Sequence, residues 1–128
     1  MEKKKIFTQK LNFSIRFIKN CSEPKKCLVV ADDGKIYFFD LEKEEYMEDK
    51  LFEGHSDIIT DIAFLHSQNK LVTCSLDQTI KIWDERNGFI DSIQLEEEVY
   101  PWGLAILEQN QEIVVGTEDG CFYVYDLN

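Results

Sequence analysis

Few residues in this chain have the chemistry for acid–base catalysis, since it contains only two histidines, His55 and His66. A carboxylate such as that of Asp77 could orient the His55 imidazole as a general base, which makes the two residues a candidate catalytic pair. The chain has no Gly-x-Ser-x-Gly elbow, glycine-rich phosphate loop or His-x-x-x-His pair. His66 falls in a polar turn with no other reactive side chain. We therefore expect no catalytic residues and a non-enzymatic protein.

Metal-binding patterns are missing from the sequence as well. The cysteines show no Cys-x-x-Cys spacing, and they are Cys21, Cys27, Cys74 and Cys121. The acidic clusters at residues 42–49 and 96–98 do not follow the spacing of a calcium-binding loop. We expect reduced structural cysteines, solvated acidic loops, no metal and no cofactor.

Charge is unevenly distributed along the 128 residues, whose net charge is -11. Residues 1–26 hold eight of the fourteen basic residues and two acidic ones, which leaves the rest with six basic against 23 acidic residues. This balance argues against nucleic-acid binding, which needs clustered lysine and arginine. No apolar run reaches the roughly 20 residues of a membrane span, and no signal segment follows Met1. We expect an intracellular protein, cytoplasmic or nuclear, with no membrane partner.

An internal repeat positions these side chains. Three segments share a short apolar run, a polar turn containing Asp33, Asp77 or Asp119, and an alternating run that ends in an aromatic residue and aspartate. The turn aspartates are 44 and 42 residues apart, close to the roughly 40–45-residue period of a four-stranded propeller blade. Each segment predicts a β-hairpin, because the aspartate and glycine residues of the turns suit tight reversals.

Further strands flank each hairpin. Apolar runs at residues 13–17, 59–64 and 102–106 precede the hairpins and predict inner strands. More polar runs at residues 46–52 and 89–95 follow the first two hairpins and predict outer strands with one solvated face. Long helical periodicity is missing, so an all-β fold is expected.

The segment from Gly54-His55-Ser56-Asp57 to Trp83-Asp84 resembles a WD repeat, with Gly-His at its start and Trp-Asp at its end. The resemblance implies three four-stranded antiparallel blades of a partial WD-repeat β-propeller, with repeats at about residues 6–41, 46–85 and 89–127. It also implies a buried structural network in place of the catalytic pair, formed by His55, Thr73 (or Ser75), Asp77 and Trp83. The first and third repeats depart from the pattern, because Phe39-Asp40 and Tyr125-Asp126 replace Trp-Asp.

The same resemblance implies a scaffold that binds a protein partner at the top face of the blades, where the aspartate turns lie. The implied contact residues are Phe13, Asp32, Thr60, Leu76, Trp102 and Glu118. Their aromatic rings and carboxylates suit an arginine or lysine side chain, so a basic peptide is the expected partner. Core packing is the alternative for Trp102, and turn formation is the alternative for Asp32 and Glu118.

Two other functions are open. Trp83-Asp84-Glu85-Arg86 resembles the Trp-Asp-x-Arg motif of substrate receptors in cullin-type ubiquitin ligases, in which Arg86 would contact the ligase adaptor. The neighbouring repeats do not carry the motif in tandem. A propeller hydrolase is the third possibility, and the sequence offers no nucleophile and base for it.

Three blades cannot close a ring, since propellers close with about four to eight blades. The last repeat ends on Tyr123-Val124-Tyr125 without an outer strand. Residues 5–11 could supply that strand to a second copy, so that two chains form a six-bladed ring. Alternatively, the chain is part of a longer propeller with further blades.

Overall fold

The computed structural model describes residues 3–128, apart from the side chain of Asp49. Over these residues the chain forms strands and one short 3-10 helix, η1. The strands are β1 (Ile15–Asn20), β2 (Lys26–Ala31), β3 (Ile36–Asp40), β4 (Glu45–Phe52), β5 (Ile59–Leu65), β6 (Lys70–Ser75), β7 (Thr79–Asp84), β8 (Gly88–Gln94), β9 (Pro101–Leu107), β10 (Glu112–Thr117) and β11 (Phe122–Asp126), with η1 at His66–Gln68. The expected all-β fold is confirmed. The described residues include no helix long and apolar enough to cross a bilayer.

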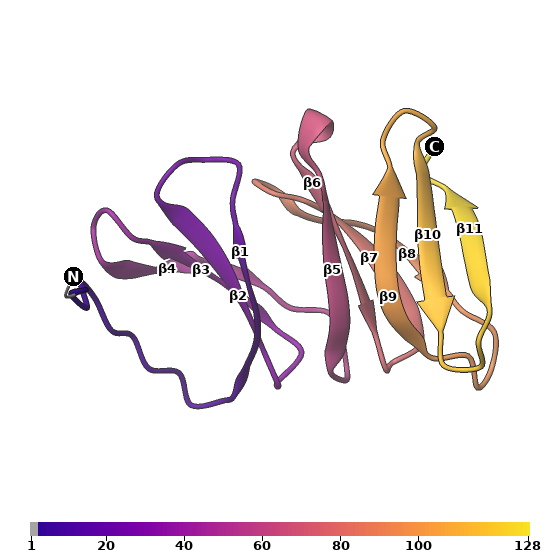
Figure 1. Cartoon of the computed structure of the whole chain (residues 1–128), viewed down its shortest axis with the longest axis horizontal. Helices are drawn as coiled ribbons and strands as arrows, with labels where there is room; N and C mark the ends of the chain where they lie inside the picture. Colours follow the sequence, from indigo (N-terminus) through magenta and orange to yellow (C-terminus); the bar gives the residue numbers. More distant parts are fainter. Residues whose placement is uncertain (1–2) are drawn as a thin grey trace.

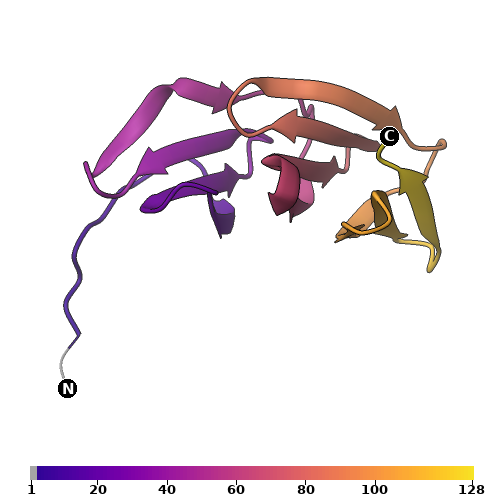
Figure 2. The same cartoon turned by 90° about the horizontal axis from the view of Figure 1, so that it is seen from above.

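Three antiparallel sheets stand side by side, and each is called a blade here. Blade 1 has the order β1-β2-β3-β4, blade 2 the order β5-β6-β7-β8, and blade 3 the order β9-β10-β11. The blades follow one another along an arc, with β1 and β5 on its concave side and β4 and β8 on its convex side (Figure 2). The top face, which carries the aspartate turns, lies along the lower edge of Figure 1. This is the arrangement of a partial propeller.

The blades repeat one another in backbone detail. At the top face, one amide in each blade donates to the carbonyl 18 residues earlier. These bonds run from Asp32 to Ser14 (2.9 Å), from Leu76 to Ile58 (3.0 Å) and from Glu118 to Tyr100 (2.9 Å). At the opposite, bottom face, equivalent bonds join Leu41 to Lys25, Glu85 to Asn69 and Leu127 to Gln111. The aspartate spacing therefore reports a true structural repeat.

Apolar side chains from adjacent blades form the core. One cluster joins blades 1 and 2 through residues that include Phe38, Phe52 and Trp83, and its Phe52 and Trp83 rings stack with centroids 5.1 Å apart. A second cluster joins blades 2 and 3 through residues that include Ile80 and Ile113. The burial of apolar side chains between adjacent blades therefore stabilises their packing against one another.

One expectation about the first 20 residues is wrong, and another, a strand that residues 5–11 supply to a second copy, stays a prediction. The first inner strand runs over Ile15–Asn20 and not over residues 13–17, because the chain bends at residues 12–13 before the sheet begins. Residues 5–11 form no strand with any part of this chain, and the segment runs away from blade 1 in Figure 2. Phe7 and Leu11 instead line an apolar groove on the outer face of blade 1, beside Ile18 and Val29.

The acidic cluster at residues 42–49 divides between a turn and a strand, because β4 begins at Glu45. The side chains of Glu42, Glu44, Glu45 and Glu48 are exposed, as expected for solvated charge. The side chain of Asp49 lies outside the described residues. The other cluster, residues 96–98, is exposed in the loop between β8 and β9.

Candidate binding face and its supporting network

A buried hydrogen-bonded network of side chains crosses blade 2 from its aspartate turn to the end of β7. The His55 Nδ1 lies 2.8 Å from Asp77 Oδ2, and His55 Nε2 lies 2.6 Å from Thr73 Oγ1. The indole N–H of Trp83 donates to the same Thr73 oxygen at 2.9 Å. The structure thus brings together the four residues that the WD-repeat resemblance implies.

The donors and acceptors of this network allow only one direction of hydrogen-bond donation, from Trp83 toward Asp77. Trp83 can only donate, so Thr73 accepts from the indole and donates its own proton to His55 Nε2. The remaining imidazole proton then lies on Nδ1 and is donated to Asp77. Every buried polar atom of the network has a partner, so the network adds no unsatisfied group to the core.

Asp77 is the final acceptor of this hydrogen-bonded network, and four donors surround its carboxylate. Besides His55, these are the backbone N–H of Ser56 (3.1 Å) and the backbone N–H (2.9 Å) and hydroxyl (2.6 Å) of Thr79. Burial by itself raises the pKa of Asp77, but the hydrogen bonds from His55 and Thr79 outweigh it. The Asp77 pKa therefore lies well below its usual range.

This geometry bears on the candidate catalytic pair. The His55 side chain has no exposed surface, and both of its ring nitrogens are within hydrogen-bond distance of protein atoms. Ser75, the alternative to Thr73, instead donates to the Asp57 carbonyl and accepts the Asp77 amide. An imidazole held in this way has no free nitrogen to offer a substrate, so the arrangement favours a structural role.

The other blades keep the turn aspartate and replace the rest of the network. At the positions that align with Thr73 and Trp83, they carry Val29 and Phe39 in blade 1 and Val115 and Tyr125 in blade 3. Phenylalanine has no N–H and needs no hydroxyl acceptor, so an apolar valine suffices beside it. Blades 1 and 3 therefore rely on apolar packing where blade 2 uses hydrogen bonds.

Each inner strand begins with a β-bulge, and the bulged residues are Arg16, Thr60 and Trp102. Arg16 donates from Nε to the Ile59 carbonyl of blade 2 at 3.1 Å. Thr60 donates to the Pro101 carbonyl of blade 3 at 2.7 Å. The bulge thus aims one side chain of each of the first two blades at the backbone of the next blade.

The positions of the bulges show that two of the predicted contact residues, Thr60 and Phe13, are wrong. Thr60 is buried, with 5% of its surface exposed, and its hydroxyl is used between blades, so it is not part of a binding face. Phe13 is half exposed but precedes β1, and the residue that aligns with Thr60 and Trp102 is Arg16. The polar Arg16 gave no inner-strand signal in the sequence.

The remaining top-face residues differ in their exposure to solvent and in whether they already have a charged partner. The Trp102 side chain is 47% exposed and Glu118 is exposed. Trp102 lies in β9 and Glu118 directly follows the neighbouring β10, so both belong to the same end of blade 3, where Pro101 pairs with Thr117. Leu76 is half-buried. The Asp32 carboxylate lies 3.8 Å from the Arg16 guanidinium, so it already has a cation beside it.

Arg86 lies at the bottom face, in the turn between β7 and β8. Its side chain is exposed, and its backbone N–H donates to Asp84 Oδ1 at 2.9 Å. No described contact distinguishes a ligase-adaptor residue from an ordinary exposed arginine, so that role stays a prediction.

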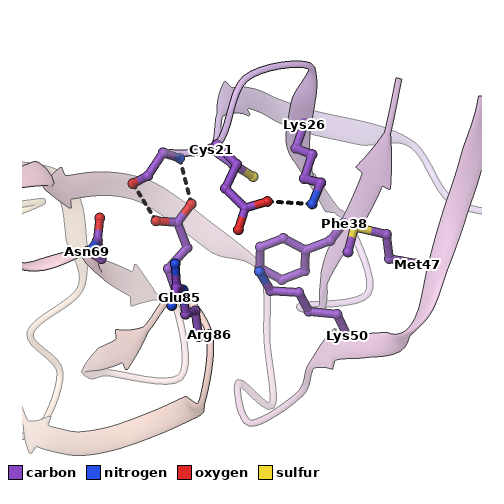
Figure 3. Close-up of a pocket in the computed structure, with 10 residues that line it drawn as sticks. Cys21, Lys26, Phe38, Met47, Lys50, Asn69, Glu85 and Arg86 are labelled. Atoms are coloured by element: carbon purple, nitrogen blue, oxygen red, sulfur yellow. Dashed lines mark hydrogen bonds and ion pairs between the residues drawn. The ribbon is translucent and has the colours of Figure 1, made fainter. Parts of the chain in front are cut away.

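Sequence reasoning missed the bottom-face contact between blades 1 and 2. Glu85 is buried, and its carboxylate accepts the backbone N–H (2.7 Å) and hydroxyl (2.5 Å) of Ser22 (Figure 3). The only local signal was a charged residue directly after Trp-Asp. Its partner is 63 residues away in sequence, so spacing could not reveal it.

The cysteines are free thiols in different environments. Burial raises the pKa of Cys74 to about 12, and burial together with the nearby Glu85 raises the pKa of Cys21 to about 12. Cys121 is exposed in the turn before β11. Within the described part of the chain, no three side chains of the metal-binding types are grouped to hold an ion.

Comparison with known proteins agrees with the geometry. The family profile "WD domain, G-beta repeat" matches residues 48–84. Protein transport protein SEC13 of Debaryomyces hansenii is 35% identical over 72 residues, which is 53% of this chain and 24% of that protein. Target of rapamycin complex subunit wat1 of Schizosaccharomyces pombe is 37% identical over 67 residues, or 52% of this chain and 21% of that protein. The matches thus span less than a quarter of these relatives.

A solved structure extends the likeness to nearly the whole chain. The WD40 β-propeller domain of Doa1 superposes with a TM-score of 0.79 at 22% identity, covering 92% of this chain and 38% of that one. This likeness concerns the fold. The profile match identifies residues 48–84 as a WD repeat, and the solved structure and the repeated blades show that the chain has the fold of a partial WD-repeat β-propeller.

Proposed function

We propose that this chain is a protein-interaction scaffold whose top face binds an arginine or lysine side chain of a basic partner segment. The proposal rests on the exposed Trp102 ring and the exposed Glu118 carboxylate, which belong to the same end of blade 3. Two relatives are named as a transport protein and as a subunit of a complex, which fits a scaffold role.

The chemistry of the two side chains suits a cation. An arginine or lysine placed over the indole face gains a cation–π contact, worth about 0.5–1 kcal/mol at an exposed site. A carboxylate beside it adds a charge-assisted hydrogen bond. The net charge of -11 adds long-range attraction for a basic segment.

Blade 1 shows how such a face holds a guanidinium. The chain's own Arg16 lies between the Asp32 carboxylate and the Ile59 carbonyl, at the bulge position that Trp102 occupies in blade 3. Blade 3 offers an indole there and Glu118 at the position of Asp32. A partner's arginine would therefore supply at blade 3 the cation that Arg16 supplies at blade 1.

The test is binding of a fluorescein-labelled acetyl-Gly-Arg-Gly-Arg-Gly-amide peptide, followed by anisotropy. We expect Trp102→Ala to weaken binding by about twofold to fivefold and Glu118→Lys to weaken it at least as much, with unchanged circular dichroism. Leu107→Ala, on the far end of the same strand, and Glu42→Lys, an equal charge change at the bottom face, are the matched controls. Equal losses in the controls would reject the site.

The two end faces of the arc, on blade 1 and blade 3, also expose apolar side chains. Phe122 (72% exposed) and Val124 (51%) are exposed on blade 3, and Ile18 (59%) is exposed on blade 1. We infer that further blades cover these faces, supplied by a second copy in a six-bladed ring or by a longer propeller. The repeat boundaries at about residues 6–41, 46–85 and 89–127 belong to this proposal. Light scattering separates a dimeric from a monomeric chain.

We place this function inside the cell, in the cytoplasm or nucleus. The support is chemical, because free thiols such as the buried Cys74 fit a reducing compartment. Fluorescence microscopy of the tagged protein tests this location, and an extracellular signal would contradict it.

A further inference from the structure

The seam between blades 1 and 2 holds two neighbouring hollows that share Lys50 and Arg86. One is a narrow pocket of about 30 Å³ at the bottom face, with Phe38 and Lys26 in its wall (Figure 3). The other is a groove of about 230 Å³ on the convex side, lined in part by Phe52 and Phe89. Because Lys50 and Arg86 line both, the two hollows form one feature, which we call the seam groove.

The carboxylates that line the seam groove already have donors. Glu23 pairs with Lys26, Glu53 lies 3.6 Å from the Lys35 ammonium, and Glu85 accepts two hydrogen bonds from Ser22. They therefore form no ion pair with the groove's other two cations.

Lys50 and Arg86 are those cations. None of the ion pairs formed by described side chains uses either of them. The Lys50 ammonium lies 4.5 Å from the centroid of the Phe38 ring, and the Arg86 side chain is exposed. Three cations and three carboxylates line the seam groove, so it is close to neutral on a chain whose net charge is -11.

Aromatic surface lies beside these cations. The Phe89 side chain is 54% exposed, and the next residue, Ile90, is 45% exposed. The Phe89 ring meets the buried Trp83 edge-on at a centroid distance of 5.8 Å, which fixes its position. A rigid, exposed aromatic ring gains free energy when an apolar side chain covers it.

We propose that the seam groove is a second docking site, for an acidic partner segment that carries a carboxylate next to an aromatic residue. The carboxylate pairs with Arg86 and Lys50, and the aromatic side chain covers Phe89. A peptide fits better than a small anion, because a bare anion leaves the exposed Phe89 and the 230 Å³ groove unused.

This site is separate from the top face. Arg86 follows the end of β7 at the bottom face, whereas the top-face turn of blade 2 lies before the start of that strand. A six-residue strand spans about 20 Å. The chain would then bind a basic segment at one face and an acidic segment at another.

The probe is a fluorescein-labelled acetyl-Glu-Glu-Phe-Asp-Glu-amide peptide, added to the full chain at low salt. We expect Arg86→Glu, Lys50→Glu and Phe89→Ser each to weaken its binding at least about tenfold. Lys43→Glu is the matched control, because this exposed lysine in the turn before β4 undergoes the same charge change outside the groove. Replacing phenylalanine by glycine in the peptide should also weaken binding.

Arg86→Gln and Lys50→Gln serve as milder variants if a charge reversal unfolds the chain, as judged by circular dichroism. Equal weakening by Lys43→Glu and Arg86→Glu would overturn the proposal, since it would show attraction without a site. Absence of binding to the unmodified chain would overturn it too. Trp102→Ala and Glu118→Lys should leave the acidic peptide bound, so failure of the top-face proposal is distinguishable from failure of this one.

Discussion

The indole N–H of Trp83 donates to Thr73 Oγ1 at 2.9 Å, and Thr73 in turn lies 2.6 Å from His55 Nε2. One buried hydroxyl therefore serves two aromatic side chains that come from different ends of the repeat. Blades 1 and 3 have valine at this position and lack the indole.

We predict that Thr73→Val destabilises the chain by about 1–3 kcal/mol, because the Trp83 N–H and His55 Nε2 lose their partner in a buried site. The double variant Thr73→Val with Trp83→Phe, which recreates the Val29–Phe39 pair of blade 1, should cost less than the two single variants together. Urea unfolding of the four proteins gives the coupling free energy. Strict additivity would show that Thr73 and Trp83 do not act as a unit.

Asp77 predicts a pH dependence of stability. Its pKa is lowered in the folded chain, so the unfolded chain binds a proton at higher pH than the folded chain does. The stabilisation is fully present above the unfolded value of about 4 and is lost as pH falls toward the folded value. Asp77→Asn should remove this part of the dependence, measured as unfolding free energy between neutral and acidic pH. The exposed Asp91→Asn should keep it, and an unchanged profile in Asp77→Asn would contradict the assignment.

Gly34 and Gly120 occupy equivalent turns, with φ of +78° and +85°, but their surroundings differ. A Cβ on Gly34 would lie 2.7 Å from the Asp57 carbonyl oxygen, whereas a Cβ on Gly120 would meet no atom within 4 Å. Gly120→Ala should cost about 1 kcal/mol from the backbone conformation alone. Gly34→Ala should cost clearly more, because the Asp57 and His55 backbone must also move. Equal melting temperatures for the two variants would argue against the contact between blades 1 and 2.

Glu85 and Glu108 each accept the backbone N–H and hydroxyl of a serine, Ser22 and Ser67 respectively, across a boundary between blades. Glu85 is buried and Glu108 is exposed. Glu85→Ala should therefore destabilise the chain by about 1–3 kcal/mol, because two hydrogen bonds from Ser22 to a buried carboxylate are lost. Glu108→Ala should cost less than about 0.5 kcal/mol, as exposed polar contacts do. Similar unfolding midpoints for both variants would show that the Glu85 contact adds nothing.

Local patterns predicted much of the fold. The aspartate spacing, the apolar runs and the aspartate-containing turns indicated the hairpins, and the Gly-His and Trp-Asp pairs indicated the network residues. Contacts between blades were beyond reach, because their partners are far apart in sequence. Thr60 looked like a free polar residue on an inner strand, yet its hydroxyl is bound to Pro101, 41 residues later.

The first blade shows a second limit. Arg16 occupies a bulge that only the strand register reveals, so Phe13 was aligned in its place. Residues 5–11 are expected to form a strand only against a second copy, and within this chain they pair with no strand.

The most direct test of the repeated-blade architecture is amide hydrogen exchange followed by NMR. The protected amides should recur once per blade at each face, at Asp32, Leu76 and Glu118 and at Leu41, Glu85 and Leu127. All of them should exchange much more slowly than the amides of residues 3–10. Protection confined to one of the three segments would contradict the account, because it would mean that the other two do not form the same sheet.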